Sequence, residues 1–285
     1  MRTIKQIVDK FKNDRRIRGY RRNKILLVSD DCIINDSEIV LIGSSRLRIG
    51  KGCRILGSRI ELKNAEMVLG AACTISEASF RCGSRSIKNC EISVEANTTL
   101  ERYEFLIDGT LHIGEKSRFS GDDKSKLVVR RDGSLSFGQE AMVTGTEVIV
   151  LDKATLNIGN WFGIGPGSEL RAASNIDIGD FVLISYGVTI FDTNTHSTDW
   201  RIRQKEILAS RGRDSIDNCV RTSDVRIGSN SWIGKNAVIL RGAIIGERSI
   251  VGIGAIVGAG HYPEDAKIVG CKAKPIAPEK PDEEA

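Results

Sequence analysis

Apolar residues recur at every sixth position between residues 227 and 262, near the end of the chain. A glycine follows five of the six, and Ser or Ala comes four residues after each of the first five. The six aliphatic residues are Ile227, Ile233, Ile239, Ile245, Val251 and Val257. A period of six is neither that of a helix nor that of a half-buried strand. It is typical of a triangular solenoid, in which each flat face takes six residues and the aliphatic side chain points inward.

A looser form of the same repeat begins near residue 24. Each copy begins with an apolar residue, any residue, a second apolar residue and then Gly. A further apolar residue comes five positions after that glycine. The second apolar positions are Ile49, Leu69, Ile113, Phe137, Ile158 and Ile178, with a degenerate copy near Ile92. Because successive copies lie more than eighteen residues apart, we expect short excursions at the corners of the coils. A solenoid of another cross-section stays open for this half.

The repeat is interrupted once, between Ile178 and Ile227. One coil accounts for part of this interval, and the rest, at about 192–224, is predicted to leave the stack as a long loop. A loop of this length in a compact fold usually carries function. The predicted organisation is an N-terminal segment at 1–24, a β-helix at 25–262 and a C-terminal extension with a Pro-rich acidic tail at 263–285.

The first 24 residues are strongly basic, with ten Lys or Arg and two Asp, whereas the whole chain has a net charge of +5. Ile4, Ile7, Val8 and Phe11 have the spacing of a short amphipathic helix. Two interpretations stay open: peripheral contact with an anionic membrane surface, or a helix that covers the first edge strand. We favour the second. Nucleic acid is not indicated, because no binding motif or interleaved aromatic residues occur.

Composition fits an all-β solenoid. Glycine is frequent at 29 residues, aromatic residues make up 5%, and no proline precedes Pro166, so a long hydrogen-bonded stack is permitted. The seven cysteines form no CxxC pair and are expected to be small reduced core residues, as Cys53 and Cys73 in successive repeats suggest. Without a signal peptide or an apolar run of membrane-spanning length, we expect a cytoplasmic protein, with the inner membrane face as a further option.

The predicted loop contains one of the three histidines. It begins with Asp192-Thr193-Asn194-Thr195-His196, whereas His112 is expected on an outward strand position and His261 in a surface turn. No metal site is predicted, because these three histidines are not placed to converge on zinc. Neutral imidazole can accept a hydroxyl proton near neutral pH, so His196 is the candidate general base.

The C-terminal repeats resemble a known family. Trp232-Ile233-Gly234, Gly252-Ile253-Gly254-Ala255 and the segment from Ile268 to Lys274 are similar to the hexapeptide-repeat acyltransferases, in the branch of maltose, galactoside and capsular-polysaccharide O-acetyltransferases. The resemblance is specific over about 176–274. It implies an all-β fold, the left-handed parallel β-helix, and acetyl transfer from acetyl-CoA to a sugar hydroxyl.

The resemblance also implies roles for individual residues. In the family the catalytic histidine lies in a loop with an Asp-x-Asp-x-His segment, which matches His196 with Asp192 as its orienting partner. Asp199 is also close in sequence and stays open as an alternative partner. Asn194 stands where the family has a second acidic residue. Asn194, Trp200 and Arg201 are predicted to contact the saccharide, although Trp200 is also suited to packing the loop onto the stack. The residues predicted to hold acetyl-CoA are Trp232, Gly234, Ala237, Gly254, Ala255, Lys272 and Lys274.

The family resemblance further implies a homotrimer with sites shared between neighbouring subunits. The predicted function is thus acetyl-CoA-dependent O-acetylation of a surface polysaccharide or its precursor. Two alternatives remain at this point: N-acetylation of a nucleotide-linked amino sugar, and a non-catalytic β-helix that serves as a scaffold.

Overall fold

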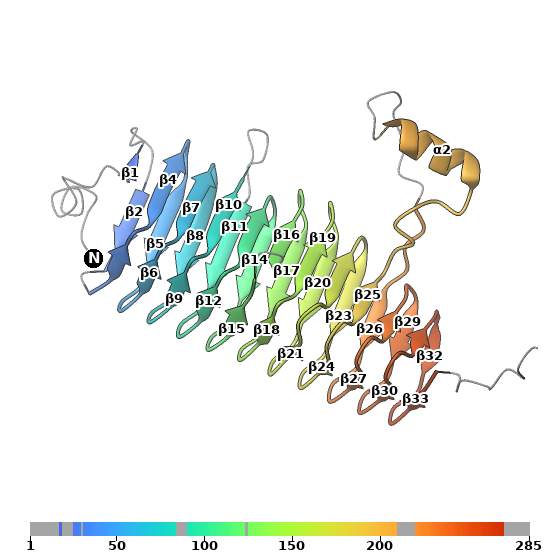
Figure 1. Ribbon diagram of the computed structural model, residues 1–285. Coiled ribbons are helices and arrows are strands. Elements are labelled where there is room, and N and C mark those ends of the chain that lie inside the picture. The colour runs from blue at the N-terminus through green and yellow to red at the C-terminus, as the bar shows by residue number, and fades with distance from the viewer. Residues whose placement is uncertain are drawn as a thin grey trace, which may run out of the picture.

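The computed structural model describes residues 17–18, 25–29, 31–83, 90–122, 125–209 and 220–270. Within these residues the chain winds into a three-sided stack of three sheets, each with eleven parallel strands. Every strand pairs with the strands three before and three after it in the chain, so each coil gives one strand to each sheet (Figure 1). The predicted left-handed parallel β-helix is therefore confirmed, and the N-terminal half has the same cross-section as the C-terminal half.

The strands are short, and corners separate them. Sheet A contains β2 (Ile25–Val28), β5 (Arg46–Ile49), β8 (Ala65–Leu69), β11 (Cys90–Val94), β14 (Thr110–Ile113), β17 (Ser134–Phe137), β20 (Thr155–Ile158), β23 (Asn175–Ile178), β26 (Val225–Ile227), β29 (Ala243–Ile245) and β32 (Gly260–Tyr262). Sheet B contains β1 (Ile17–Arg18), β4 (Glu38–Ile42), β7 (Arg59–Lys63), β10 (Ser79–Cys82), β13 (Glu104–Ile107), β16 (Lys126–Val129), β19 (Glu147–Val150), β22 (Glu169–Ala172), β25 (Thr189–Phe191), β28 (Val238–Ile239) and β31 (Ile256–Val257). Sheet C contains β3 (Ile33–Asn35), β6 (Arg54–Leu56), β9 (Thr74–Ser76), β12 (Thr99–Glu101), β15 (Arg118–Ser120), β18 (Met142–Thr144), β21 (Gly163–Ile164), β24 (Leu183–Ile184), β27 (Trp232–Ile233), β30 (Ile250–Val251) and β33 (Lys267–Ile268). The described residues outside the stack include one helix, α2 (Trp200–Ala209).

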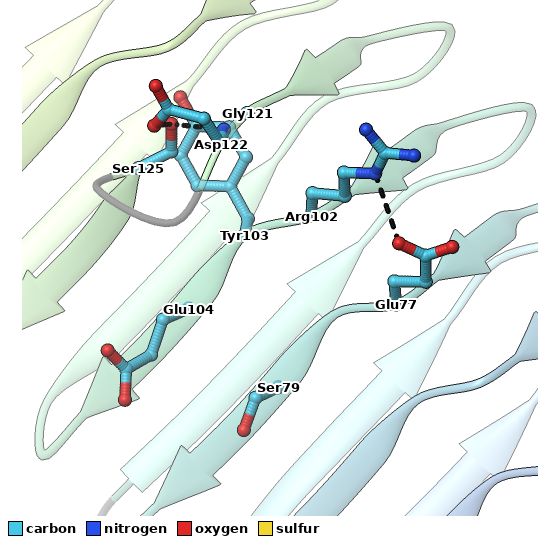
Figure 2. Close-up of a pocket in the computed structure, with 8 residues that line it drawn as sticks. All are labelled: Glu77, Ser79, Arg102, Tyr103, Glu104, Gly121, Asp122 and Ser125. Atoms are coloured by element: carbon cyan, nitrogen blue, oxygen red, sulfur yellow. Dashed lines mark hydrogen bonds and ion pairs between the residues drawn. The ribbon is translucent and has the colours of Figure 1, made fainter.

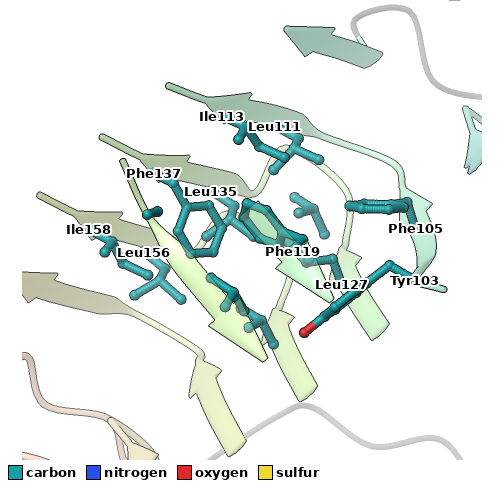
Figure 3. Close-up of a cluster of buried hydrophobic side chains, with 14 of the residues drawn as sticks. Tyr103, Phe105, Leu111, Ile113, Phe119, Leu127, Leu135, Phe137, Leu156 and Ile158 are labelled. Atoms are coloured by element: carbon teal, nitrogen blue, oxygen red, sulfur yellow. The ribbon is translucent and has the colours of Figure 1, made fainter. Parts of the chain in front are cut away.

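Alternation along each strand builds the core. The apolar positions of the repeat are buried, and the residue between them faces outward, as in β14 and β17. The register places Leu111 beside Leu135 and Leu135 beside Leu156, so equivalent side chains stack from coil to coil (Figure 3). Phe119 and Phe137 meet edge to face, with ring centroids 5.0 Å apart. Such continuous apolar rows bury surface that one coil could not bury alone.

The glycine that recurs in the repeat is explained by the close packing of successive coils. A β-carbon on Gly50 would lie 2.6 Å from the carbonyl carbon of Gly70, so glycine is required by the close approach of the next coil. The left-handed backbone conformation falls two residues later and is often taken by other residues, such as Glu140 and Phe181. The small residue after it is buried: Cys53, for example, donates its thiol to the Gly70 carbonyl at 3.0 Å.

Tyr103 is a large side chain buried at a corner of the stack. It occupies a corner position that holds a small residue in other coils, and its hydroxyl accepts from the Thr146 amide (3.1 Å) and donates to the Thr146 carbonyl (3.3 Å). Burial raises the pKa of Tyr103 to about 12. Tyr103, Gly121, Asp122 and Ser125 line the same pocket at this corner (Figure 2).

The prediction of reduced cysteines is wrong for one pair. Cys82 and Cys90 form a disulfide across the corner between β10 and β11. Sequence spacing gave no sign of it, because eight residues separate the pair and the bond depends on the corner that brings the two strand ends together. Cys53 and Cys73 are free and buried, as predicted.

The ends of the stack differ from the predicted boundaries. β1 lies within the basic segment and pairs with β4, and β33 lies beyond residue 262 and pairs with β30. The amphipathic helix predicted from Ile4 to Phe11 and the acidic tail lie outside the described residues. Among the residues described, no helix is long and apolar enough to cross a membrane.

Candidate active site

A long loop leaves the stack at the corner between sheets B and A. β25 ends at Phe191 and β26 begins at Val225. A short antiparallel neck forms where the loop departs and returns: Thr193 bridges Thr222, and the Asn194 amide donates to the Arg221 carbonyl at 3.1 Å. The loop projects away from the coils and carries α2 at its far part (Figure 1).

Asp192 fixes the root of this loop and does not orient His196. Its side chain is fully buried and accepts from the Ala173 amide (2.7 Å) and the Ser174 amide (2.8 Å) of the preceding coil. Burial raises the pKa of the Asp192 carboxyl, and these hydrogen bonds act against that rise. The geometry thus gives Asp192 an anchoring place, in contrast to the predicted pairing with the histidine.

Glu206 takes the place that the sequence assigned to Asp192. Nδ1 of His196 lies 2.8 Å from Oε2 of Glu206, and Oε1 of the same carboxylate accepts from the Ser197 amide at 3.3 Å. The hydrogen bond with His196 lowers the pKa of the Glu206 carboxyl. The His196 side chain is 71% exposed, so its other ring nitrogen is open to a ligand.

Helix α2 brings Glu206 to the histidine. Asp199 caps the helix, since its carboxylate accepts from the Arg201 amide at 2.9 Å. The Arg203 guanidinium donates to the Ser197 carbonyl at 2.8 Å and ties the first turn back to the segment that carries His196. The helix was not predicted. Its capping signal, Ser197-Thr198-Asp199 before a run of helix-forming residues, was present in the sequence and could have indicated it.

The three residues predicted to contact the saccharide differ in their surroundings. Trp200 is 61% exposed and does not pack onto the stack, and the Arg201 guanidinium lies 5.6 Å from the centre of its ring. Asn194 is at the neck, where its side-chain oxygen accepts from Nε of Arg241 at 2.6 Å and its carbonyl accepts from the His196 amide at 2.7 Å. Arg241 was not singled out from the sequence.

The residues predicted to hold acetyl-CoA divide into two groups. Trp232 is 48% exposed, and a β-carbon on Gly254 would meet nothing within 4 Å, so both are open to a ligand. Ala237 and Ala255 are buried at corners, and Gly234 is packed against the Val251 carbonyl, so their side-chain positions face the stack. Lys272 and Lys274 lie outside the described residues.

Sheet C has an exposed apolar row in its later coils. The register aligns Leu183 with Trp232 and Trp232 with Ile250, and all three side chains face outward. A groove of about 510 Å³ runs over this face between Met142 and Trp232. At the adjoining corner, the rings of Trp161 and Phe181 stack 4.6 Å apart. At the equivalent outward position, the second to fifth coils have the polar residues Arg54, Thr74, Thr99 and Arg118, whereas the first coil has the exposed Ile33. In the described coils, a continuous apolar row therefore occurs only toward the end that carries the loop.

Comparison with known proteins identifies the family and the relatives that this chain resembles. Residues 224–259 match the bacterial transferase hexapeptide family, described as six repeats. The predicted resemblance to the hexapeptide-repeat acyltransferases is confirmed. The polysialic acid O-acetyltransferase of Neisseria meningitidis is 22% identical over 169 residues, which are 59% of this chain and 66% of that protein. Among solved structures, the polySia-specific acetyltransferase NeuO aligns with a TM-score of 0.41 and 17% identity, over 90% of this chain and 85% of that one.

These hexapeptide repeats lie directly after the loop. The matched segment begins at Asp224, where the loop returns, and it contains Trp232 and Gly254. Within the described residues, no three His, Cys, Asp or Glu side chains are grouped so that they could hold a metal ion. The candidate site consists of the loop and the coils that follow it.

Proposed function

We propose that this chain transfers an acetyl group from acetyl-CoA to a hydroxyl of a polysaccharide, with His196 as the general base. The observation that carries the proposal is the contact between His196 Nδ1 and Glu206 Oε2 at 2.8 Å, on a loop beside hexapeptide repeats. The relative from Neisseria meningitidis is named as an O-acetyltransferase of polysialic acid, which supports a polysaccharide acceptor.

The pair is suited to take a proton from a hydroxyl. An ionised carboxylate only accepts hydrogen bonds, so Glu206 selects the tautomer in which Nδ1 carries the hydrogen and Nε2 is the free base. Nε2 can then accept the acceptor's hydroxyl proton as its oxygen attacks the thioester carbonyl that acetyl-CoA supplies. The ring becomes positively charged in that step, and the adjacent carboxylate stabilises it. His196 returns the proton to the departing thiolate.

We propose that the donor lies along the last coils, where Trp232 and Gly254 are open. We further propose a homotrimer. The exposed apolar row on sheet C supports this assembly, because apolar rows of this extent usually mark interaction surfaces. Light scattering should then give a mass three times that of one chain, and substituting Leu183 and Trp232 by Ser should reduce it. An unchanged trimer in that double variant would place the interface elsewhere.

A transfer assay tests the activity itself. Acetyl-CoA labelled in the acetyl group is incubated with the protein and with polysaccharides that carry free hydroxyls, free amines or both. We expect label on the polymer that mild alkali releases, because esters are cleaved under these conditions and amides are not, with one CoA thiol formed per acetyl group transferred. Alkali-stable label would indicate N-acetylation, and the absence of both label and CoA binding would indicate a scaffold.

A further inference from the structure

Arg241 lies where the coil after the loop meets the loop's neck. It follows β28 at the corner between sheets B and A, and its side chain is partly buried. Nε donates to Oδ1 of Asn194 at 2.6 Å. This contact uses one nitrogen of the guanidinium and fixes the plane of the group, so the two terminal nitrogens are left to face another ligand.

The charge of Arg241 is not compensated by the part of the chain that the structure describes. No carboxylate in those residues lies within ion-pairing distance of it, in contrast to Arg226 and Arg248 on neighbouring coils, which pair with Asp177 and Asp265 respectively. The side chain that does contact Arg241 is a neutral amide. An aspartate at position 194 would place a carboxylate against this arginine and form an ion pair with it. Asn194 keeps the hydrogen bond and does not neutralise the positive charge of Arg241.

The same asparagine connects Arg241 to the candidate base. Its carbonyl accepts from the His196 amide at 2.7 Å, while its side chain accepts from Arg241. An anion on the free nitrogens of Arg241 would therefore lie at the neck, where the chain continues to His196 two residues after Asn194. A guanidinium binds a carboxylate with two parallel hydrogen bonds, which fixes orientation as well as adding affinity.

We infer that Arg241 binds a carboxylate of the acceptor, so that the polysaccharide acetylated here is an acidic one; this rests on the proposed function. The phosphates of acetyl-CoA are the other source of anions, but the pantetheine arm separates them from the thioester and hence from His196. Arg241 is accordingly a specificity-determining residue that holds the acceptor, and Asn194 is the residue that keeps it available.

The test compares an oligomer of sialic acid with the same oligomer after its carboxyl groups are reduced to alcohols. Arg241→Gln keeps a donor toward Asn194 and removes the charge, whereas Asn194→Asp keeps the arginine and neutralises it. Each variant should raise KM for the acidic oligomer about 10- to 100-fold, as expected for a charged hydrogen-bonded pair. KM for the reduced oligomer and for acetyl-CoA should change less than twofold. Arg226→Gln, which removes an outward arginine of a neighbouring coil, is the matched control and should change neither.

Three results would overturn the inference. A rise in KM for acetyl-CoA alone would assign Arg241 to the donor's phosphates. An equal rise for both oligomers would mean that the residue acts on the shape of the loop. Unchanged constants would mean that it binds no anion. Titration calorimetry of the acidic oligomer without acetyl-CoA separates this question from the proposed function: if the wild type acetylates nothing, loss of oligomer binding in Arg241→Gln still supports the anion site, and equal binding still refutes it.

Discussion

The stack and the loop are held together in different ways. In the stack, Leu135 lies between Leu111 and Leu156, and every strand has parallel neighbours on both sides except at the ends. In the loop, α2 has no buried residue, and His196 is held by Glu206 and by backbone contacts at the neck. A rigid scaffold with an exposed loop is a common way of placing reactive groups. The difference indicates that stability depends on the coils, whereas the catalysis proposed above depends on a few polar contacts outside them.

His196→Ala is expected to show the largest difference between an effect on activity and an effect on stability. Loss of the general base should lower kcat at least 100-fold, and because the side chain is exposed, Tm should be nearly unchanged. Initial rates and thermal unfolding measured on the same preparation check both parts. His112→Ala is the control, since His112 is an outward residue of β14 and should leave kcat unaltered. Equal rates for His196→Ala and wild type would remove the proposed mechanism.

A core substitution should show the opposite behaviour. Leu135→Ala deletes a fully buried side chain in the middle of sheet A and should lower the free energy of unfolding by about 2–5 kcal/mol. Ser136→Ala, on the outward face of the same strand, should change it by less than about 0.5 kcal/mol. Denaturant titration gives both values. Similar values for the two variants would mean that the coil interior is not a packed core.

Much of this contrast could be predicted from the sequence, because the same hydrophobic pattern recurs in every coil. Spacing alone placed Ile49 and Phe137 inside, and the interruption between Ile178 and Ile227 revealed the loop. Within the loop no repeat exists, so the partner of His196 could not be inferred from spacing. Asp192 was chosen because it matches an acidic position of the family's motif, yet two amides of the previous coil hold its carboxylate against the stack. Glu206 reaches the ring because a helix, which has no counterpart in the repeat, carries it there.

The smallest expected effect is on the pH dependence of the free energy of unfolding, through Asp192 at the root of the loop. Burial raises the pKa of Asp192 in the folded protein above its value in the unfolded chain. The folded state then binds the proton more tightly, so the stability from this group is present below the unfolded pKa, near 3.9, and is lost as pH rises through the folded pKa. Asp192→Asn should remove this slope from a plot of unfolding free energy against pH. A slope that persists in the variant would have to come from another group.

The central claim is that Glu206 acts through His196, and a double-mutant cycle tests it most directly. Initial rates of acetyl transfer are compared for wild type, Glu206→Gln, His196→Ala and the double variant. Glu206→Gln should lower kcat about 10-fold or more when His196 is present, and it should have no further effect in His196→Ala, because the carboxylate then has no imidazole to orient. An equal loss in both backgrounds would contradict the account, since Glu206 would then act independently of the histidine.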